Sequence, residues 1–153
     1  MDVSSLQPFV QPLSFLLFFV VLWLAVSGGL ALVAGWSSLA GKFRQTEPLL
    51  SERFTSVSGA MGKGRLPVGY RSSLFVVVGH AGFSLAVLFP FRFLSPPLYI
   101  PWPEVEKVEE GKLLLVRHTV VHLRGQGQVI FIRGPAGPCI REGYDSARRQ
   151  TVF

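Results

Sequence analysis

Residues 13 to 34 read LSFLLFFVVLWLAVSGGLALVA, and every one of them is apolar or small. The uncharged stretch around this run is longer, because no Asp, Glu, Lys, Arg or His occurs between Val3 and Gly41. About 20 apolar residues are enough to cross the hydrocarbon core of a bilayer as an α-helix. The run therefore predicts a single transmembrane helix over residues 13–36. A short outer tail is expected at residues 1–12, with Pro12 where a helix can begin.

The charges that flank this helix predict its orientation. Asp2 precedes it, whereas Lys42, Arg44 and Arg53 are the first of the basic residues that follow it. By the positive-inside rule, the N-terminus lies outside and the rest of the chain lies in the cytoplasm, at the cell (inner or plasma) membrane. A cleaved signal peptide is disfavoured, because no basic residue precedes the apolar run and Leu32 stands where a cleavage site needs a small residue.

The chain after the helix is basic, with 15 Lys and Arg against eight Asp and Glu, a net charge of +7. Anionic lipid attracts Lys and Arg near a membrane surface by about 1 kcal/mol each. The basic residues are scattered singly and form no recognised nucleic-acid module, so the expected partner is the lipid bilayer and not nucleic acid. The lone Cys139 can form no internal disulfide, which agrees with a reducing cytoplasm.

Beyond the helix, the sequence changes to short β-prone runs separated by Gly and Pro. Residues 37–52 are expected to be a cytoplasmic continuation and linker, in which Pro48 ends any helix. A small mainly-β domain is expected at residues 53–153, with a closing helix at 138–149. Its strands are expected where β-branched, aromatic and other apolar residues gather: 54–61, 73–78, 83–89, 98–105, 112–124 and 129–133.

Residues 72–91 also permit a second interpretation, because this stretch contains no Asp, Glu, Lys or Arg. By hydropathy it would be a second membrane helix. The Val76-Val77-Val78 run, the central Gly79-His80-Ala81-Gly82 and the alternation of large and small residues after it favour a β-hairpin. We therefore expect a hairpin with His80 in its turn, and the two-helix topology is the alternative.

The motif Pro97-Leu98-Tyr99-Ile100-Pro101-Trp102-Pro103-Glu104-Val105 follows this hairpin. With an anchor helix before it and a helix after it, the order resembles that of small PH-like domains in bacterial membrane proteins of unknown function, in which a strand of the form L-x-IPW-x-E-I follows a hairpin. The likeness covers residues 53–149 and is most specific at 82–105. It implies a half-open barrel of two nearly orthogonal antiparallel sheets with a C-terminal helix in one end. It implies no activity, because such folds carry many unrelated functions.

The length of that C-terminal helix is less clear from the sequence, because Gly137 and Pro138 stand near its start. Residues 142–149 alone give barely two turns. We therefore expect a short helix that plugs the barrel only in part.

Three basic residues in the loop between the first two expected strands, Lys63, Arg65 and Arg71, are the candidate site for anionic lipid headgroups. In PH-like folds that bind lipid, basic residues of this loop hold the phosphates, Lys as a point charge and Arg through forked hydrogen bonds. The simpler reading is that topology alone places basic residues beside a membrane.

Other polar clusters are expected to have ordinary roles. His118 and His122 would lie about 13 Å apart on a strand, too far to share a metal ion. Since the sequence has no recognisable nucleophile elbow or phosphate-binding loop, we expect no enzyme activity, no cofactor and no metal. Four carboxylates are expected in a solvated turn and not as an acid–base pair in a cleft: Glu104, Glu106, Glu109 and Glu110.

Within the helix, Ser27, Ala31 and Gly35 recur every four residues and form a stripe of small side chains. Such stripes let two membrane helices approach closely, so self-association or a partner helix is expected there.

Together these features predict a membrane-anchored PH-like module that binds or scaffolds another membrane protein or anionic lipid. The alternative is a small accessory subunit of a larger membrane complex, with Phe89, Phe91 and Phe93 packed against other subunits. A second alternative is the two-helix protein with residues 72–91 as its second span.

Overall fold

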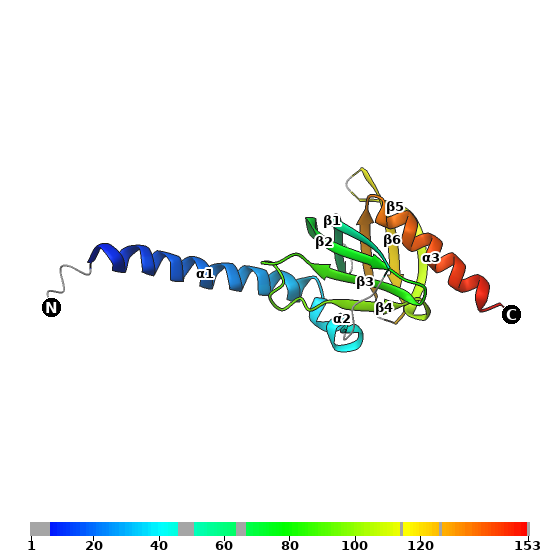
Figure 1. The fold of residues 1–153 in the computed structure, drawn as a ribbon, viewed down its shortest axis with the longest axis horizontal. Helices are drawn as coiled ribbons and strands as arrows, with labels where there is room; N and C mark the ends of the chain where they lie inside the picture. The colour runs from blue at the N-terminus through cyan, green and yellow to red at the C-terminus, as the bar shows by residue number, and fades with distance from the viewer. Residues whose placement is uncertain (1–6, 46–50, 64–66, 114, 126, 153) are drawn as a thin grey trace.

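The computed structural model describes residues 7–45, 51–63, 67–113, 115–125 and 127–152. A long apolar helix projects from a curled antiparallel sheet, and the C-terminal helix ends at the opposite end of the molecule (Figure 1). The elements follow in this order: α1 (Gln7–Val33), α2 (Trp36–Phe43), β1 (Glu52–Lys63), β2 (Val68–Val78), β3 (Gly82–Val87), β4 (Leu98–Pro101), η2 (Trp102–Glu104), β5 (Val105–Leu113), β6 (Val116–Leu123), β7 (Gln128–Arg133) and α3 (Ala136–Gln150).

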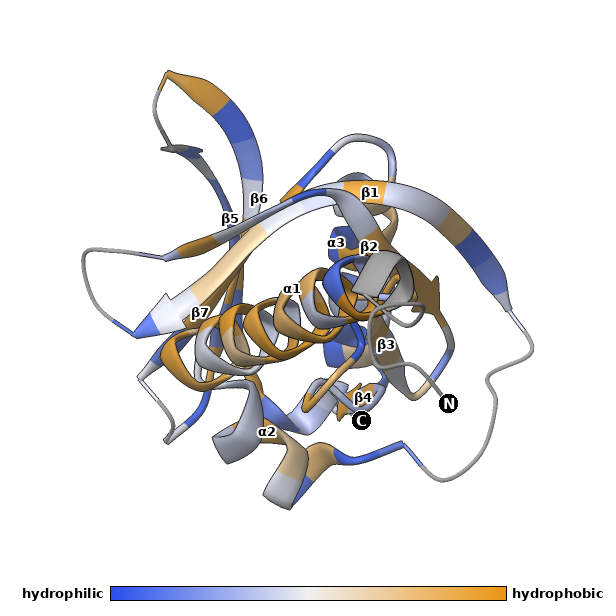
Figure 2. Cartoon of the chain, turned by 90° about the vertical axis from the view of Figure 1, so that its left-hand side faces the viewer, coloured by the Kyte–Doolittle hydropathy of each residue, from blue (hydrophilic) through white to orange (hydrophobic). Residues whose placement is uncertain are grey.

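The strands form one sheet in the order β4-β3-β2-β1-β7-β6-β5. All of its neighbouring pairs are antiparallel. Strand β1 pairs with β2 along its length and with β7 from Ser58 onward, so one strand belongs to both halves of the sheet. An irregularity in its pairing between Phe54 and Val57, with Ser56 at a φ of 55°, bends β1 at the corner. The sheet consequently curls into a half-barrel (Figure 2).

Strand β3 is buried along most of its length, as expected of apolar residues in the middle of a covered sheet, with Phe83 and Leu85 fully inaccessible. Strand β2 alternates instead, so that Leu74, Val76 and Val78 face the core. Residues 72–91 therefore form a hairpin and the start of a loop, and not a second membrane helix.

Helix α3 closes the open side of the half-barrel. Ile140 and Tyr144 are buried, and the Tyr144 hydroxyl donates a 2.8 Å hydrogen bond to the carbonyl oxygen of Glu106. The expectation of barely two turns was wrong, since α3 has 15 residues. Pro138 lies in the first turn, where backbone N–H groups have no partner within the helix, so it does not interrupt α3.

Helix α2 lies within the segment expected to be a linker. Its Trp36, Leu39 and Phe43 side chains are buried in the core of the domain. Helix α1 also begins earlier than expected, and Pro12 lies inside it. The apolar side chains of residues 36–43 therefore pack in the core of the half-barrel and do not simply extend the membrane helix.

Most of the acidic segment is a strand and not a turn. Strand β4 ends at Pro101, Glu104 lies in the η2 turn that follows, and β5 carries Glu106, Glu109 and Glu110. Charged residues suit β5 because it is an edge of the sheet, where they oppose pairing with other chains.

Candidate functional site

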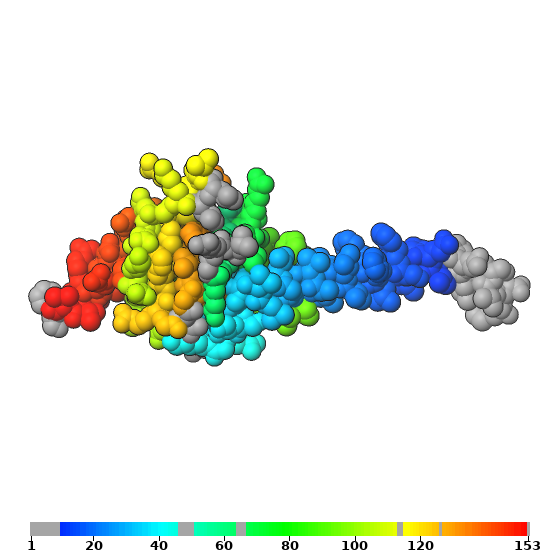
Figure 3. All heavy atoms as spheres, turned by 180° about the vertical axis from the view of Figure 1, so that it is seen from behind, coloured from blue at the N-terminus to red at the C-terminus, as the bar shows by residue number. Residues whose placement is uncertain are grey.

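The end of the domain from which α1 projects carries the most unusual surface of the described chain. Residues Val10–Val33 form the one described helix that is long and apolar enough to cross a membrane. Side chains such as Phe15, Leu17 and Val21 are more than half exposed. In the space-filling view, most of α1 extends beyond the domain without touching it (Figure 3).

The base of α1 is fastened to the half-barrel and not hinged. Gln128 of β7 donates a 2.6 Å hydrogen bond from its Nε2 to the Ala34 carbonyl, one of the carbonyls that a helix end leaves without a partner. The indole N–H of Trp36 donates to the Pro96 carbonyl at 2.8 Å. These two bonds and the buried residues of α2 fix the direction in which α1 leaves the domain.

The loop that joins β3 to β4, residues 88–97, lies beside the base of α1 (Figure 1). Phe91 packs on Trp23 of α1 with 6.3 Å between ring centroids. Leu94 lies next to Gly28, where a Cβ would come within 3.1 Å of its Cδ1. The loop nevertheless exposes large apolar side chains, above all Phe89, which is 81% exposed. Exposed apolar clusters of this kind mark contact with a membrane or a partner.

An open groove of about 850 Å³, which we call the base groove, lies between α1, α2 and this loop. Its apolar lining includes Trp23, Leu24, Phe89 and Phe93, and Arg44 and Arg92 also line it. Sequence reasoning singled out Phe89 and Phe93 as part of a possible contact surface, but it missed the groove and its two arginines. Its signal was Leu-Phe-Pro-Phe-Arg-Phe-Leu at residues 88–94, in which a cation stands among aromatic residues.

A smaller hollow of about 240 Å³ is lined by Ser27, Ala31, Tyr70 and Arg71 among others. The Tyr70 hydroxyl is buried there with no hydrogen-bond partner among the described residues. Burial raises the pKa of Tyr70 to about 12, because the phenolate would lose its hydration. Tyr70 is therefore neutral throughout the physiological range.

Of the three basic residues proposed from the sequence, the two that the structure describes, Lys63 and Arg71, lie apart. Lys63 ends β1 opposite Gln128, whereas Arg71 follows Tyr70 on β2, whose partner is Gly59. The ladder separates Lys63 from the level of Arg71 by about 16 Å. Arg65 lies outside the described residues.

The stripe of small residues on α1 faces the protein's own domain. Ala31 belongs to the core, and Ser27 is buried. Gly35 ends the helix at a φ of 74°, where a Cβ would come within 2.8 Å of the Gln128 amide. The surface that the sequence suggested for a second helix is therefore already covered by the same chain.

The two histidines singled out from the sequence, His118 and His122, have different partners. His122 lies 2.7 Å from Glu109, while the Nδ1 atom of His118 contacts the Val116 carbonyl. Hydrogen bonds from Lys107 and His122 lower the pKa of Glu109. Within the described residues, no group of three His, Cys, Asp or Glu side chains is placed to hold a metal ion.

Cys139 is a poor nucleophile. Burial, followed by its 3.0 Å contact with the Glu52 carboxylate, raises its pKa to about 11. The thiol therefore stays protonated at neutral pH, whereas nucleophilic cysteines need the thiolate.

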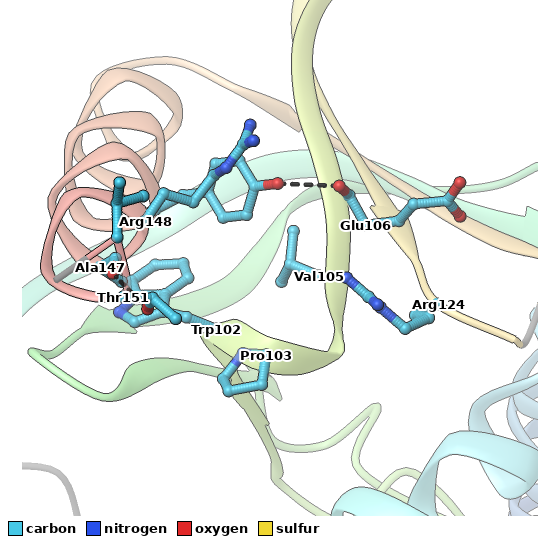
Figure 4. A pocket seen from close by; sticks show the side chains of 10 residues that line it. Trp102, Pro103, Val105, Glu106, Arg124, Ala147, Arg148 and Thr151 are labelled. Atoms are coloured by element: carbon cyan, nitrogen blue, oxygen red, sulfur yellow. Dashed lines mark hydrogen bonds between the residues drawn. The ribbon is translucent and has the colours of Figure 1, made fainter.

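A second cavity, of about 460 Å³, lies at the other end of the domain where α3 meets the η2 turn (Figure 4). Trp102 and Val105 contribute apolar surface, and Arg124 and Arg148 border it. The indole N–H of Trp102 is already bound to the His80 carbonyl at 2.8 Å. The hydroxyl of Tyr144 is likewise bound to the backbone, so these two polar groups already have partners within the domain.

Comparison with known proteins assigns the chain to no family, since no protein-family model and no curated protein matches it. The resemblance of residues 82–105 to PH-like domains stays a prediction, and the half-barrel architecture rests on the structure.

Proposed function

We propose that this protein is a single-pass membrane protein whose half-barrel domain is held rigidly against the cytoplasmic face of the membrane as a binding or scaffolding module. The observation that carries the proposal is the contact between the apolar 88–97 loop and α1. A helix of membrane-spanning length and a loop of exposed aromatic residues lie side by side, and both need an apolar environment.

The dimensions of α1 support this arrangement. Its 24-residue, uncharged span Val10–Val33 corresponds to about 36 Å of helix, compared with a hydrocarbon core of about 30 Å. Trp23 precedes Val33 by ten residues, or about 15 Å along the helix. Because Phe91 packs on Trp23, a bilayer that covered all of Val10–Val33 would also surround the tip of the loop, about 15 Å inside the end of the span. The exposed phenylalanine rings of the loop favour such an apolar environment over water.

The basic residues near the base of α1 support a cytoplasmic location of the domain. Exposed cations near the base of α1, including Lys42, Arg44, Arg71 and Arg92, would lie beside the leaflet on the domain side. We expect that a reporter that works only in the cytoplasm is active when it is fused after residue 153. Activity of a reporter that requires export would contradict the orientation.

Loop insertion is tested in the full-length chain with Cys139→Ser as background. A Phe89→Cys variant carries an environment-sensitive fluorophore in phosphatidylcholine vesicles, and Gln150→Cys, at the end of α3, is the matched control. We expect blue-shifted emission and quenching by nitroxide-labelled lipid at position 89, and neither at position 150. Water-like emission at both positions would contradict loop insertion.

The same exposed aromatic residues favour the second candidate function, an accessory subunit of a membrane complex. In that case Phe89, Phe91 and Phe93 would contact another protein and not lipid. A position-89 probe that stays in water in pure lipid vesicles, together with aggregation of the purified chain, would favour this candidate.

A further inference from the structure

The base groove has both an apolar and a positively charged lining. Trp23 and Leu24 come from α1, and Phe89 and Phe93 come from the 88–97 loop, so apolar side chains line it from two elements. Arg44, at the C-terminal end of α2, adds positive charge. The second cation, Arg92, stands between Phe91 and Phe93 in the sequence.

The cations of this groove have no acidic counterpart within the described chain. No described carboxylate lines the groove, and none of the ion pairs among the described residues involves Arg44 or Arg92. The neighbouring Lys42 differs, because its Nζ lies 2.7 Å from a Glu104 carboxylate oxygen. Two exposed guanidinium groups beside aromatic surface are therefore available to an anion, and guanidinium binds phosphate oxygens through forked hydrogen bonds.

We propose that the base groove holds one anionic phospholipid of the adjacent leaflet. Its phosphate lies with Arg44 and Arg92, and an acyl chain lies along Trp23 and Phe93. This inference rests on the proposed function, since it needs the groove to border a bilayer. The volume of about 850 Å³ is in the range of small-molecule sites, large enough for a headgroup and the first part of its chains.

Amphipathic chemistry favours a phospholipid over a free phosphate. A soluble phosphate would use the two arginines and leave the aromatic lining in water, whereas a phospholipid would cover both. Neither Lys63 nor Arg71 lines the groove, so the lipid contact proposed here does not depend on the described residues that the sequence first suggested.

The test measures lipid retention by the full-length chain in detergent, using native mass spectrometry with added phosphatidylglycerol or phosphatidylcholine. The groove variant is Arg44→Gln/Arg92→Gln. Its matched control, Arg53→Gln/Arg117→Gln, removes the same charge from two exposed strand positions that do not line the groove. Thermal unfolding of both variants checks that they are folded.

We expect one phosphatidylglycerol to bind the wild type, and at least about tenfold weaker binding to the groove variant, because each lost charge-assisted bond is worth more than a neutral one. The control should bind within about twofold of the wild type. Equal binding of phosphatidylcholine and phosphatidylglycerol, or equal losses in both variants, would overturn the proposal. Displacement of the lipid by glycerol 3-phosphate at equal concentration would also overturn it, in favour of a free-phosphate site.

The position-89 probe separates this inference from the function on which it rests. A lipid-embedded probe with unchanged lipid retention in the groove variant would refute the lipid site alone. A probe in water would refute the membrane-docked loop itself.

Discussion

Gly35 is the residue at which the membrane helix becomes part of the domain. Its φ of 74° is left-handed, which ends α1, and Trp36 then begins α2 in the core. A Cβ at this position would also come within 2.8 Å of the Gln128 amide. The backbone conformation therefore favours glycine here, and a Cβ would in addition require the Gln128 side chain to shift.

We expect Gly35→Ala to lower the free energy of unfolding by roughly 1–2 kcal/mol, the cost of a left-handed residue with a Cβ. The matched control is Gly41→Ala in α2, where nothing lies within 4 Å of the added Cβ. That change should raise the same free energy by about 0.5–1 kcal/mol, because alanine is the better helix former. Denaturant unfolding of the full chain in detergent measures both, and the same sign of change in the two variants would contradict this account.

Among the elements, α3 confirms the helix expected at 138–149 but is longer than the two turns that Gly137 and Pro138 suggested. The sequence placed a helix at 138–149 but could not show what its polar pattern covers. In the structure, Ile140 is fully buried, and Gly143 lies so close to Trp102 that a Cβ would come within 2.6 Å of the ring. Helix α3 is therefore packed against the core and is not a frayed terminal segment.

Truncation of Ile140 to Ala should lower the free energy of unfolding by about 2–5 kcal/mol, since it removes buried methylene groups and leaves a cavity. Glu142→Ala, an exposed position on the same helix, should change it by less than about 0.5 kcal/mol. Near-ultraviolet circular dichroism during denaturation compares the two variants. Similar small effects would mean that α3 does not plug the half-barrel.

At the scale of the whole molecule, the boundary of the domain lies before α2 and not after it. Trp36, Leu39 and Phe43 belong to the same core cluster as Phe83 and Ile100. The membrane helix and the half-barrel are consequently joined by a folded element.

Two fragments test this boundary. We expect residues 36–153 to give a β-rich, cooperatively unfolding product, and residues 50–153 to unfold at a lower temperature or aggregate. The shorter fragment loses three buried side chains, each worth about 1.5–3 kcal/mol of burial. Thermal denaturation and size-exclusion chromatography compare them, and equal stability would place the boundary after α2.

Features that depend on local composition could be predicted from the amino-acid sequence. Membrane-length hydropathy predicted α1, and β-propensity with Gly and Pro turns located β1, β3 and β7 to within two residues and the second half of β2. It also indicated a hairpin in place of a second span at residues 72–91. These features follow from short-range patterns of apolar residues, which a single sequence displays directly.

The tertiary structure decided what depends on contacts between distant residues. It showed that Ser27 and Ala31 face the chain's own domain, that the carboxylates of β5 lie on a sheet edge, and that Arg44 and Arg92 line the same groove. The physical reason is that spacing in a sequence shows which residues share a face of an element, but not what that face covers. Only the curl of the sheet, with α2 and α3 packed on it and the base of α1 beside it, brings these partners together.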